Sequence, residues 1–225
     1  MTNSNLNITK RFRSERVKTA RGRKISSTKW LNRQLNDPYV KEAQERGYRS
    51  RAAFKILEIN EKFKIFKKGY KVVDLGSAPG GWSQVVVGLV GENNVLATDI
   101  LDMPAIAGVK FIKKNFLDDD AEDQIISNMD NKKCDVIMSD MAANTTGDKK
   151  TDQLRTSNLI ESAIFFAKKV LKENGVFVAK VFQGGTEKNL FDILKANFKT
   201  VKHFKPNSSR KESKEIYVVA MGFRG

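Results

Sequence analysis

The chain has 225 residues, 40% of them hydrophobic, and it carries a formal net charge of +15 at pH 7. This length and composition predict one globular core and exclude a wholly disordered protein. The excess of Lys and Arg favours a polyanionic partner such as nucleic acid. No apolar run approaches the ~20 residues of a membrane-spanning helix, so we expect no membrane contact.

The N-terminal segment is strongly basic. Residues 1–33 contain ten Lys or Arg residues and a single acid, Glu15, without a regular apolar face. They predict a basic arm over residues 1–37 that stays flexible until it meets a polyanion. Residues 38–225 are expected to form one domain, and a second basic segment at residues 202–214 favours nucleic-acid binding over a solubilising role for the arm. The chain shows no signal-peptide core, so we expect it in the cytoplasm.

Helical and strand patterns alternate along the domain. Amphipathic spacing predicts helices over residues 38–47, 50–66, 81–90, 119–129, 152–173 and 186–197. Short apolar segments predict strands over residues 71–75, 94–99, 109–112, 134–140, 176–182, 199–204 and 215–223. Continuous apolar strands between helices are typical of parallel strands buried on both faces, so we expect a doubly wound α/β sheet. Only a basic loop joins the last two strands, which predicts an antiparallel element at one edge of a sheet of about seven strands.

The single cysteine and the single histidine limit the chemistry. Cys134 opens a predicted apolar strand, so we expect a buried thiol rather than a nucleophile. His203 stands alone among lysines, and one Cys with one His do not make the ligand set of a zinc site. We therefore expect no metal.

The segment VVDLGSAPGGW, residues 72–82, combines a strand with a glycine-rich turn. Asp74 ends the strand, and the helix that begins near Gly81 aims backbone N–H groups at an anion. Asp99 closes the next strand, about 20 residues after the turn, where an acid binds ribose hydroxyls in this type of fold. Together these features predict a site for an adenosine-containing ligand. Ala78 occupies the place of a fingerprint glycine, which disfavours a nicotinamide cofactor.

Four charged residues are expected to face one cleft. The first lies on the helix predicted over 50–66 and the others stand at ends of predicted strands; they are Lys55, Asp140, Lys180 and Glu215. Ordinary ion pairs are the structural alternative. Because buried ion pairs are weak evidence for stability, four charges at one sheet edge favour a functional site.

Four segments of the chain resemble one family. They are DLGSAPGGWSQ at 74–84, SDMAAN at 139–144, AKVFQG at 179–184 and SSRKESKEIYVVA at 208–220. The segments are similar to those of the FtsJ family, also called RlmE or RrmJ, of ribosomal RNA ribose methyltransferases, from about Tyr48 to the C-terminus. The resemblance implies a Rossmann-like class I methyltransferase fold. It also implies S-adenosylmethionine-dependent 2′-O-methylation of a uridine in 23S ribosomal RNA, on the assembled 50S subunit.

The same resemblance implies roles for individual residues. The catalytic set is Lys55, Asp140, Lys180 and Glu215, and the cofactor-binding set is Gly80, Trp82, Asp99, Asn115 and Asp140. Two positions depart from the family. Asn115 stands where an aspartate commonly lies beside the adenine, and its amide both accepts and donates, so we expect altered hydrogen bonding there. Ala143 stands where proline is common.

Methylation of an alcohol requires a hydroxyl aligned behind the methyl group, and the hydroxyl must lose its proton. Lys180 is the residue expected nearest that hydroxyl, at the carboxyl end of a strand beside the ligand crevice. Two roles stay open: a neutral Lys180 takes the proton as general base, or a charged Lys180 orients the hydroxyl. Asp140 and Glu215 then steer Lys180, and Lys55 helps to place the substrate. A 2′-hydroxyl acceptor means RNA, because DNA lacks that group.

Two other functions stay open at this point. A non-catalytic RNA-binding ribosome-assembly factor would share the fold and the basic surface without needing the charged set. A nicotinamide-dependent oxidoreductase would share the sheet, but the chain lacks its glycine fingerprint. Base amine methylation is disfavoured because Met141, Ala142 and Ala143 stand where such enzymes commonly carry two prolines and an aromatic residue. We expect a monomer.

Overall fold

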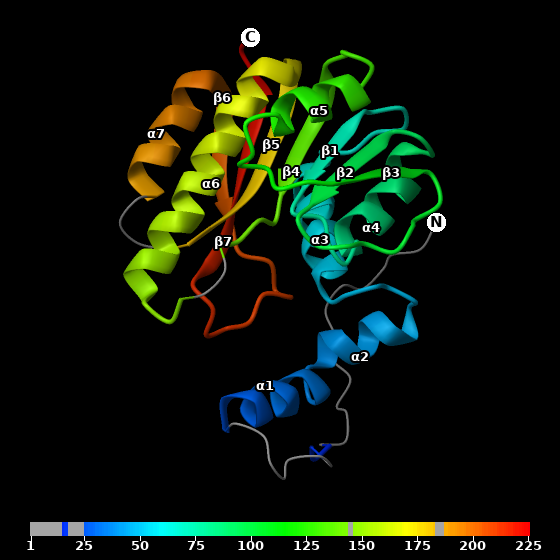
Figure 1. Ribbon diagram of the computed structural model, residues 1–225, viewed down its shortest axis with the longest axis vertical. Coiled ribbons are helices and arrows are strands. Elements are labelled where there is room, and N and C mark those ends of the chain that lie inside the picture. Colours follow the sequence, from blue (N-terminus) through cyan, green and yellow to red (C-terminus); the bar gives the residue numbers. More distant parts are fainter. Residues whose placement is uncertain (1–14, 18–24, 144–145, 183–186) are drawn as a thin grey trace.

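The computed structural model describes residues 15–17, 25–143, 146–182 and 187–225, in which one sheet is covered by helices on both faces (Figure 1). The sheet has the strand order β3-β2-β1-β4-β5-β7-β6. The strands are β1 Val72–Leu75, β2 Val95–Asp99, β3 Val109–Lys113, β4 Cys134–Ser139, β5 Leu171–Phe182, β6 Phe198–Phe204 and β7 Glu215–Phe223. The helices are α1 Ile25–Leu35, α2 Pro38–Glu45, α3 Ala52–Phe63, α4 Gly81–Val90, α5 Ala121–Asn128, α6 Lys149–Val170 and α7 Glu187–Asn197.

The strand pairing confirms the predicted sheet. The five strands from β3 to β5 in the sheet order pair parallel, and β7 is antiparallel to both β5 and β6. Side chains of β1 alternate between two cores: Val73 and Leu75 pack with α5 and α6, whereas Val72 packs with α3 and α4. Burial on both faces is the reason that the parallel strands read as continuous apolar runs.

Several predicted boundaries differ by three to five residues: the helix predicted over 50–66 ends at Phe63, the helix predicted over 152–173 ends at Val170, and the strand predicted over 176–182 begins at Leu171. The chain enters β5 at Leu171, which pairs with Cys134 at the start of β4. Asn174 then adopts a left-handed φ of 63°. This pairing joins segments far apart in the chain, and the local apolar pattern carries no signal for it.

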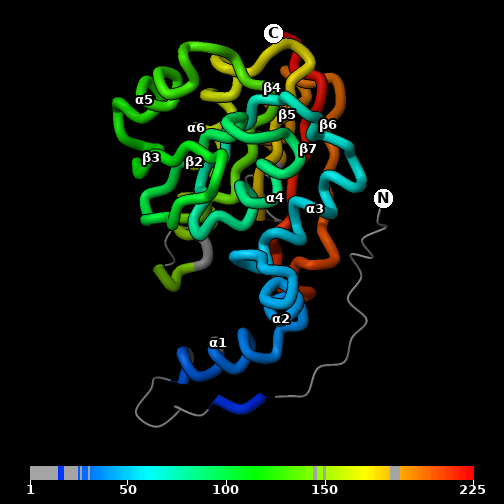
Figure 2. Tube along the Cα trace, turned by 90° about the vertical axis from the view of Figure 1, so that its right-hand side faces the viewer, coloured from blue at the N-terminus to red at the C-terminus, as the bar shows by residue number. Residues whose placement is uncertain are grey.

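Helices α1 and α2 lie beyond the carboxyl edge of the sheet, the edge at which its parallel strands end (Figures 1 and 2). Helix α1 falls within the predicted flexible arm, and the apolar pattern does not predict it. Polar contacts follow its end, where the Asn36 amide donates to the main-chain oxygens of Glu15 at 2.9 Å and Asn32 at 2.8 Å. Residues 1–14 and 18–24 lie outside the described residues, so the flexibility of the arm stays a prediction. None of the described helices combines the length and the hydropathy needed to cross a membrane.

Candidate active site

Two charged residues meet at the carboxyl edge, where β4 and β5 end side by side. The ammonium of Lys180 donates to the main-chain oxygen of Asp140 at 2.6 Å and lies 3.1 Å from Asp140 Oδ1. The register explains this meeting, because Ser139 pairs with Ala179 and the next residues of the two strands are Asp140 and Lys180. The Lys180 side chain is only 8% exposed, so little water surrounds the ammonium.

The hydroxyl of Tyr217 links the other two predicted residues to this pair. It donates to Asp140 Oδ1 at 2.9 Å and accepts a hydrogen bond from Lys55 Nζ at 2.9 Å. Lys55 Nζ also lies 3.5 Å from Glu215 Oε2, so the structure brings all four predicted charged residues into one connected cluster. Tyr217 was not among the predicted site residues. Its position two residues after Glu215 places both side chains on the same face of β7, which is the sequence feature that points to it.

The surrounding charges fix the ionisation of this cluster. Burial raises the pKa of Asp140, but the charges of Lys180 and Lys55 and the hydrogen bonds to Asp140 outweigh it, so the pKa lies below its usual value. Burial raises the pKa of Tyr217 well above its usual value, and the neighbouring carboxylates Asp140 and Glu215 add to the effect. At neutral pH the cluster therefore contains an Asp140 carboxylate and a neutral Tyr217 phenol that donates to it.

Buried polar contacts fix the loop that precedes β7. Glu58 of α3 accepts the main-chain N–H groups of Asn207 at 2.5 Å and Ser208 at 3.0 Å. Arg51, at the start of the same helix, contacts the main-chain oxygen of Ser208 and the carboxylate of Asp37. Burial lowers the pKa of Arg51 to about 10, which leaves it charged at neutral pH. These contacts hold α3 and the loop as one unit, so they also fix the lysine and the glutamate that the two segments supply to the cluster.

Neighbouring segments approach the backbone of the turn between β1 and α4 closely. Gly80 has a φ of 100°, and a side chain there would meet Ile106 Cδ1 at 2.8 Å. Gly76 has a φ of 75°, and a side chain there would meet Met141 at 2.7 Å. Both positions therefore require glycine. The first N–H groups of α4 have no acceptor within the helix, which suits this helix end to a negatively charged ligand group.

Buried polar atoms gather around this turn. Within the described residues, those without a hydrogen-bond partner include Ser50 Oγ, Asp74 Oδ1, Ser77 Oγ and Thr98 Oγ1. Burial raises the pKa of Asp74 to about 7, although a hydrogen bond of 2.6 Å from Ser83 Oγ opposes the shift. Buried polar groups of this kind cost free energy unless a ligand or water satisfies them. The turn therefore fits a ligand that carries both donors and acceptors, as S-adenosylmethionine does.

Two predicted cofactor residues differ in what they offer a ligand. The carboxylate of Asp99 accepts the N–H groups of Ala78 and Leu101, each at 2.8 Å, and retains lone pairs for further donors. Trp82 is 3% exposed and its indole N–H donates to the main-chain oxygen of Ala52 at 2.9 Å. The side chain of Trp82 is thus part of the core, and its main-chain N–H at the start of α4 is the group available for binding.

Asn115 lies on an exposed loop after β3. Its side-chain amide donates to Asp118 Oδ1 at 2.9 Å and accepts the N–H of Leu117 at 3.2 Å, so its polar atoms already have partners within the loop.

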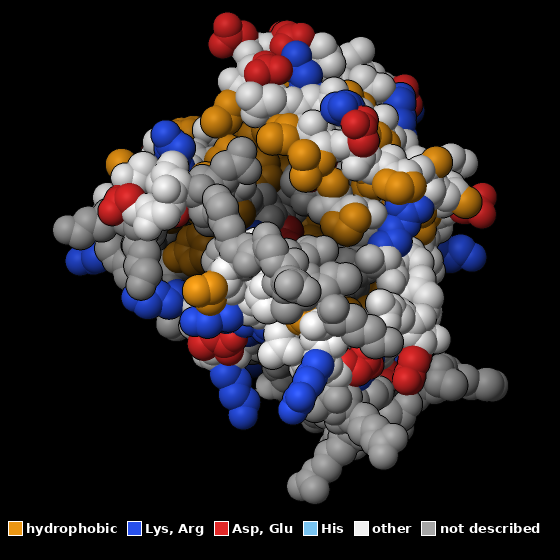
Figure 3. All heavy atoms as spheres, turned by 60° about the horizontal axis from the view of Figure 1, so that its bottom comes forward, with side chains coloured by type: hydrophobic (Ala, Val, Ile, Leu, Met, Phe, Trp, Pro, Cys, Tyr) orange, Lys and Arg blue, Asp and Glu red, His pale blue; other side chains and the backbone are white. Residues whose placement is uncertain are grey.

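Large hydrophobic side chains are exposed beside the ends of β2 and β3: Ile100 by 50%, Leu101 by 61% and Leu117 by 54%. Figure 3, which brings the bottom of Figure 1 forward, shows a hollow among hydrophobic side chains with an acidic side chain in its depth.

Comparison with known proteins identifies related sequences over most of the chain. A family model described as FtsJ-like methyltransferase matches residues 48–223. A protein from Maricaulis maris named ribosomal RNA large subunit methyltransferase E is 56% identical over 211 residues, covering 94% of this chain and 75% of that protein. A protein of the same name from Rickettsia akari is 54% identical over 212 residues, covering 92% of this chain and 93% of that protein.

Solved structures agree with the predicted Rossmann-like class I methyltransferase fold. A putative ribosomal RNA methyltransferase from Plasmodium falciparum is 30% identical with a TM-score of 0.70, covering 79% of this chain and 100% of that chain. A putative ribosomal RNA methylase from Clostridium thermocellum is 20% identical with a TM-score of 0.50, covering 75% of this chain and 97% of that chain. The second likeness concerns the fold alone.

Proposed function

The chain belongs to the FtsJ-like methyltransferase family and is a methyltransferase; on that premise we propose that it methylates the 2′-hydroxyl of a uridine ribose in 23S ribosomal RNA, with S-adenosylmethionine as donor, on the assembled 50S subunit. The observation that carries the proposal is the contact of the Lys180 ammonium with Asp140 beside the glycine turn. The names of the two relatives support an RNA of the large subunit as substrate. The proposed enzyme works as a monomer in the cytoplasm.

The carboxyl edge of the sheet supplies the proposed cofactor site. The residues that would hold S-adenosylmethionine are Gly80 and the main-chain N–H of Trp82 at the turn, Asp99 after β2, Asn115 after β3 and Asp140 after β4. Bound S-adenosylmethionine supplies a methyl group activated by a positively charged sulfur. Asp99 keeps acceptor capacity for ribose hydroxyls, and the exposed apolar side chains after β2 and β3 offer a wall for an adenine ring.

Lys180 orients the acceptor hydroxyl in this mechanism. Its contacts with the main-chain oxygen and the carboxylate of Asp140 use two of the three N–H donors that a charged lysine carries. The third donor binds the ribose oxygen and directs a lone pair of that oxygen toward the methyl carbon. The hydroxyl proton passes to the carboxylate of Asp140. In the alternative, a neutral Lys180 takes that proton at the lone pair of Nζ, while its two N–H groups keep the contacts with Asp140.

The remaining members of the cluster position this pair. Tyr217 donates to the Asp140 carboxylate and thereby fixes its orientation. Lys55, held by Tyr217 and Glu215, helps to place the RNA substrate. Tyr217 and Glu215 are thus positioning residues, since they act through Asp140 and Lys55.

Basic segments outside the cluster bind the RNA backbone in this proposal. The proposed arm over residues 1–37 precedes the proposed methyltransferase domain of residues 38–225 in the sequence, and residues 202–214 add a second basic segment. Lys and Arg on these segments contact phosphates, which positions the RNA without reading its sequence. The affinity for RNA should therefore fall steeply with salt.

The test is to measure equilibrium binding of S-adenosylmethionine and of NAD, and then transfer of labelled methyl groups to purified 50S subunits, 30S subunits and naked 23S RNA. We expect the protein to bind S-adenosylmethionine and to leave NAD unbound, with the label on a uridine ribose of the 50S subunit. Binding of NAD would indicate an oxidoreductase. Absence of methyl transfer to all three substrates would favour a non-catalytic assembly factor.

A further inference from the structure

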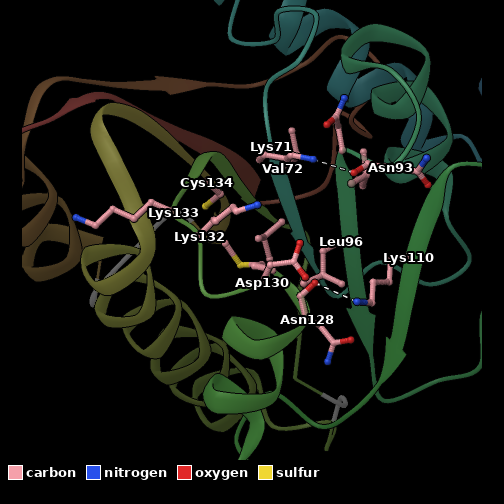
Figure 4. A pocket seen from close by; sticks show the side chains of 14 residues that line it. Lys71, Val72, Asn93, Leu96, Lys110, Asn128, Asp130, Lys132, Lys133 and Cys134 are labelled. Atoms are coloured by element: carbon pink, nitrogen blue, oxygen red, sulfur yellow. Dashed lines mark hydrogen bonds between the residues drawn. The ribbon is translucent and has the colours of Figure 1, made fainter.

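A second pocket lies at the opposite edge of the sheet, where β1, β2 and β4 begin. It is a hollow of about 530 Å³, its open mouth included, between the starts of these strands, β3 and the segment after α5. Neither the proposed cofactor site nor the charged cluster extends to this edge. Figure 4 shows its lining, in which lysine side chains from separate elements surround the hollow.

Three lysines of this pocket have no carboxylate partner among the described residues. Lys71 Nζ donates to the main-chain oxygen of Asn93 at 3.1 Å, and Lys110 Nζ donates to that of Asn128 at 3.2 Å. Lys132 is exposed and points toward the middle of the hollow (Figure 4). Within the described part of the chain, none of these three ammonium groups forms an ion pair.

The other lining groups leave this positive charge largely in place. Asp130 is the one carboxylate in the lining, against the ammonium groups of Lys71, Lys110, Lys132 and Lys133. Lys133 extends away from the middle toward α6 (Figure 4). Burial raises the pKa of the Cys134 thiol to about 12, so the thiol adds no negative charge at neutral pH. A pocket of this kind attracts a small anion whose oxygens accept several hydrogen bonds.

We propose that this pocket, which we call the amino-edge pocket, binds a phosphate of the RNA substrate. That phosphate belongs to a part of the RNA other than the nucleotides that enter the active site. The proposal rests on the proposed function. The geometry allows one RNA to reach both places, because β1, which separates them, has four residues and spans roughly 13 Å at about 3.3 Å per residue. A free nucleotide offers the same phosphate chemistry, and the experiment separates the two sources.

The first measurement is chemical acetylation of the lysines of the wild-type protein, followed by mass spectrometry. The protein is acetylated alone, with a 20-nucleotide oligouridylate, with uridine monophosphate, and with inorganic phosphate. We expect the oligouridylate to protect Lys110 and Lys132. Protection by the monophosphate or by inorganic phosphate, without protection by the oligouridylate, would assign the pocket to a free ligand and overturn the RNA assignment. Absence of protection by all three would overturn the pocket as a phosphate site.

The second measurement compares two double variants by fluorescence anisotropy with labelled oligouridylate over a range of salt. Lys110→Glu with Lys132→Glu should weaken binding about tenfold and lower the slope of log affinity against log salt by about 0.7, since the pocket binds one phosphate and each lost phosphate contact on a single strand removes about 0.7. The control, Lys195→Glu with Lys199→Glu, makes the same change of charge at exposed residues of α7 and β6, outside the pocket. It should weaken binding less than threefold.

Equal losses in the two double variants would reduce the effect to net charge and overturn the proposal. Binding of S-adenosylmethionine serves as the folding check, and we expect it unchanged in both double variants. A wild-type protein that binds the oligouridylate through the pocket yet transfers no methyl group would contradict the proposed function and leave the pocket in place, so the two failures are distinguishable.

Discussion

Tyr217 stands directly opposite Lys180 in the antiparallel pairing of β7 with β5. This pairing sets a phenol beside the ammonium on adjacent strands, and both side chains contact Asp140. The Asp140 carboxylate is therefore held from two sides, and it can keep one orientation while a ligand binds next to it.

Tyr217→Phe removes one hydroxyl and keeps the buried ring. Since hydrogen bonds to charged groups contribute about 1.5–3 kcal/mol, we expect the turnover rate to fall between about tenfold and a hundredfold. The affinity for S-adenosylmethionine should stay within threefold, because the hydroxyl does not contact the turn and Lys180 still holds Asp140 in the variant. The measurement is steady-state methyl transfer to 50S subunits beside calorimetric cofactor binding. Tyr70→Phe, at a half-buried residue outside the cluster, is the matched control and should turn over normally.

Gly80→Ala should abolish detectable binding of S-adenosylmethionine. The φ of 100° disfavours any side chain, and the new methyl group would lie 2.8 Å from Ile106 Cδ1 within the proposed cofactor site. Gly88→Ala is the control, because Gly88 lies within α4 and a side chain there would meet nothing within 4 Å. It should bind the cofactor normally and gain up to about 1 kcal/mol in the free energy of unfolding. Equal cofactor affinity in the two variants would count against the turn as the binding site.

Asp74→Asn should change how stability depends on pH in the absence of ligand. Folding raises the pKa of Asp74 to about 7, from about 3.9 in the unfolded chain. Between these values the native protein holds a proton that the unfolded chain has lost, so this group lowers the free energy of unfolding as pH rises toward 7. The full effect is on the order of 4 kcal/mol, since one pKa unit corresponds to about 1.4 kcal/mol.

Urea unfolding of both proteins at pH 5 and pH 8 checks this prediction. Asparagine stays neutral, so the variant should gain stability relative to the wild type on going from pH 5 to pH 8. All other titrating groups are common to the two proteins and cancel in the comparison. An identical difference at the two pH values would show that Asp74 does not hold a proton in the folded state.

Much of the fold was predictable because it depends on local patterns. The apolar strand at 71–75 and the helix at 81–90 follow from residue types alone, and β1 and α4 appear within one residue of them. Asp140, Lys180 and Glu215 were predictable because strand ends at one sheet edge must meet, whereas Lys55 lies on α3 and its place in the set follows from the family resemblance. Tyr217 was missed because its contacts with Asp140 and Lys55 depend on the register between β5 and β7; its place two residues after Glu215 indicates only that the two side chains share one strand face. The same limit applies to α1, whose end contacts Glu15, 21 residues before Asn36, through the Asn36 amide.

Lys180→Arg separates the two roles of Lys180. Arginine keeps the charge and the N–H donors but cannot act as a general base near neutral pH. If Lys180 orients the hydroxyl, the variant should retain measurable turnover, reduced roughly a hundredfold by the different shape of the guanidinium, with an unchanged pH profile. Turnover as low as that of Lys180→Ala at every pH would favour the general-base role.

The most direct test of the central claim is methyl transfer to 50S subunits by Lys180→Ala, beside equilibrium binding of S-adenosylmethionine. Lys172→Ala serves as the control, because Lys172 lies at the opposite end of β5 from Lys180 and forms an ion pair with Asp135. We predict that Lys180→Ala loses at least a thousandfold in turnover while its cofactor affinity stays within threefold, and that Lys172→Ala behaves as the wild type. Near-normal turnover by Lys180→Ala would contradict the assignment of Lys180 to the reacting hydroxyl.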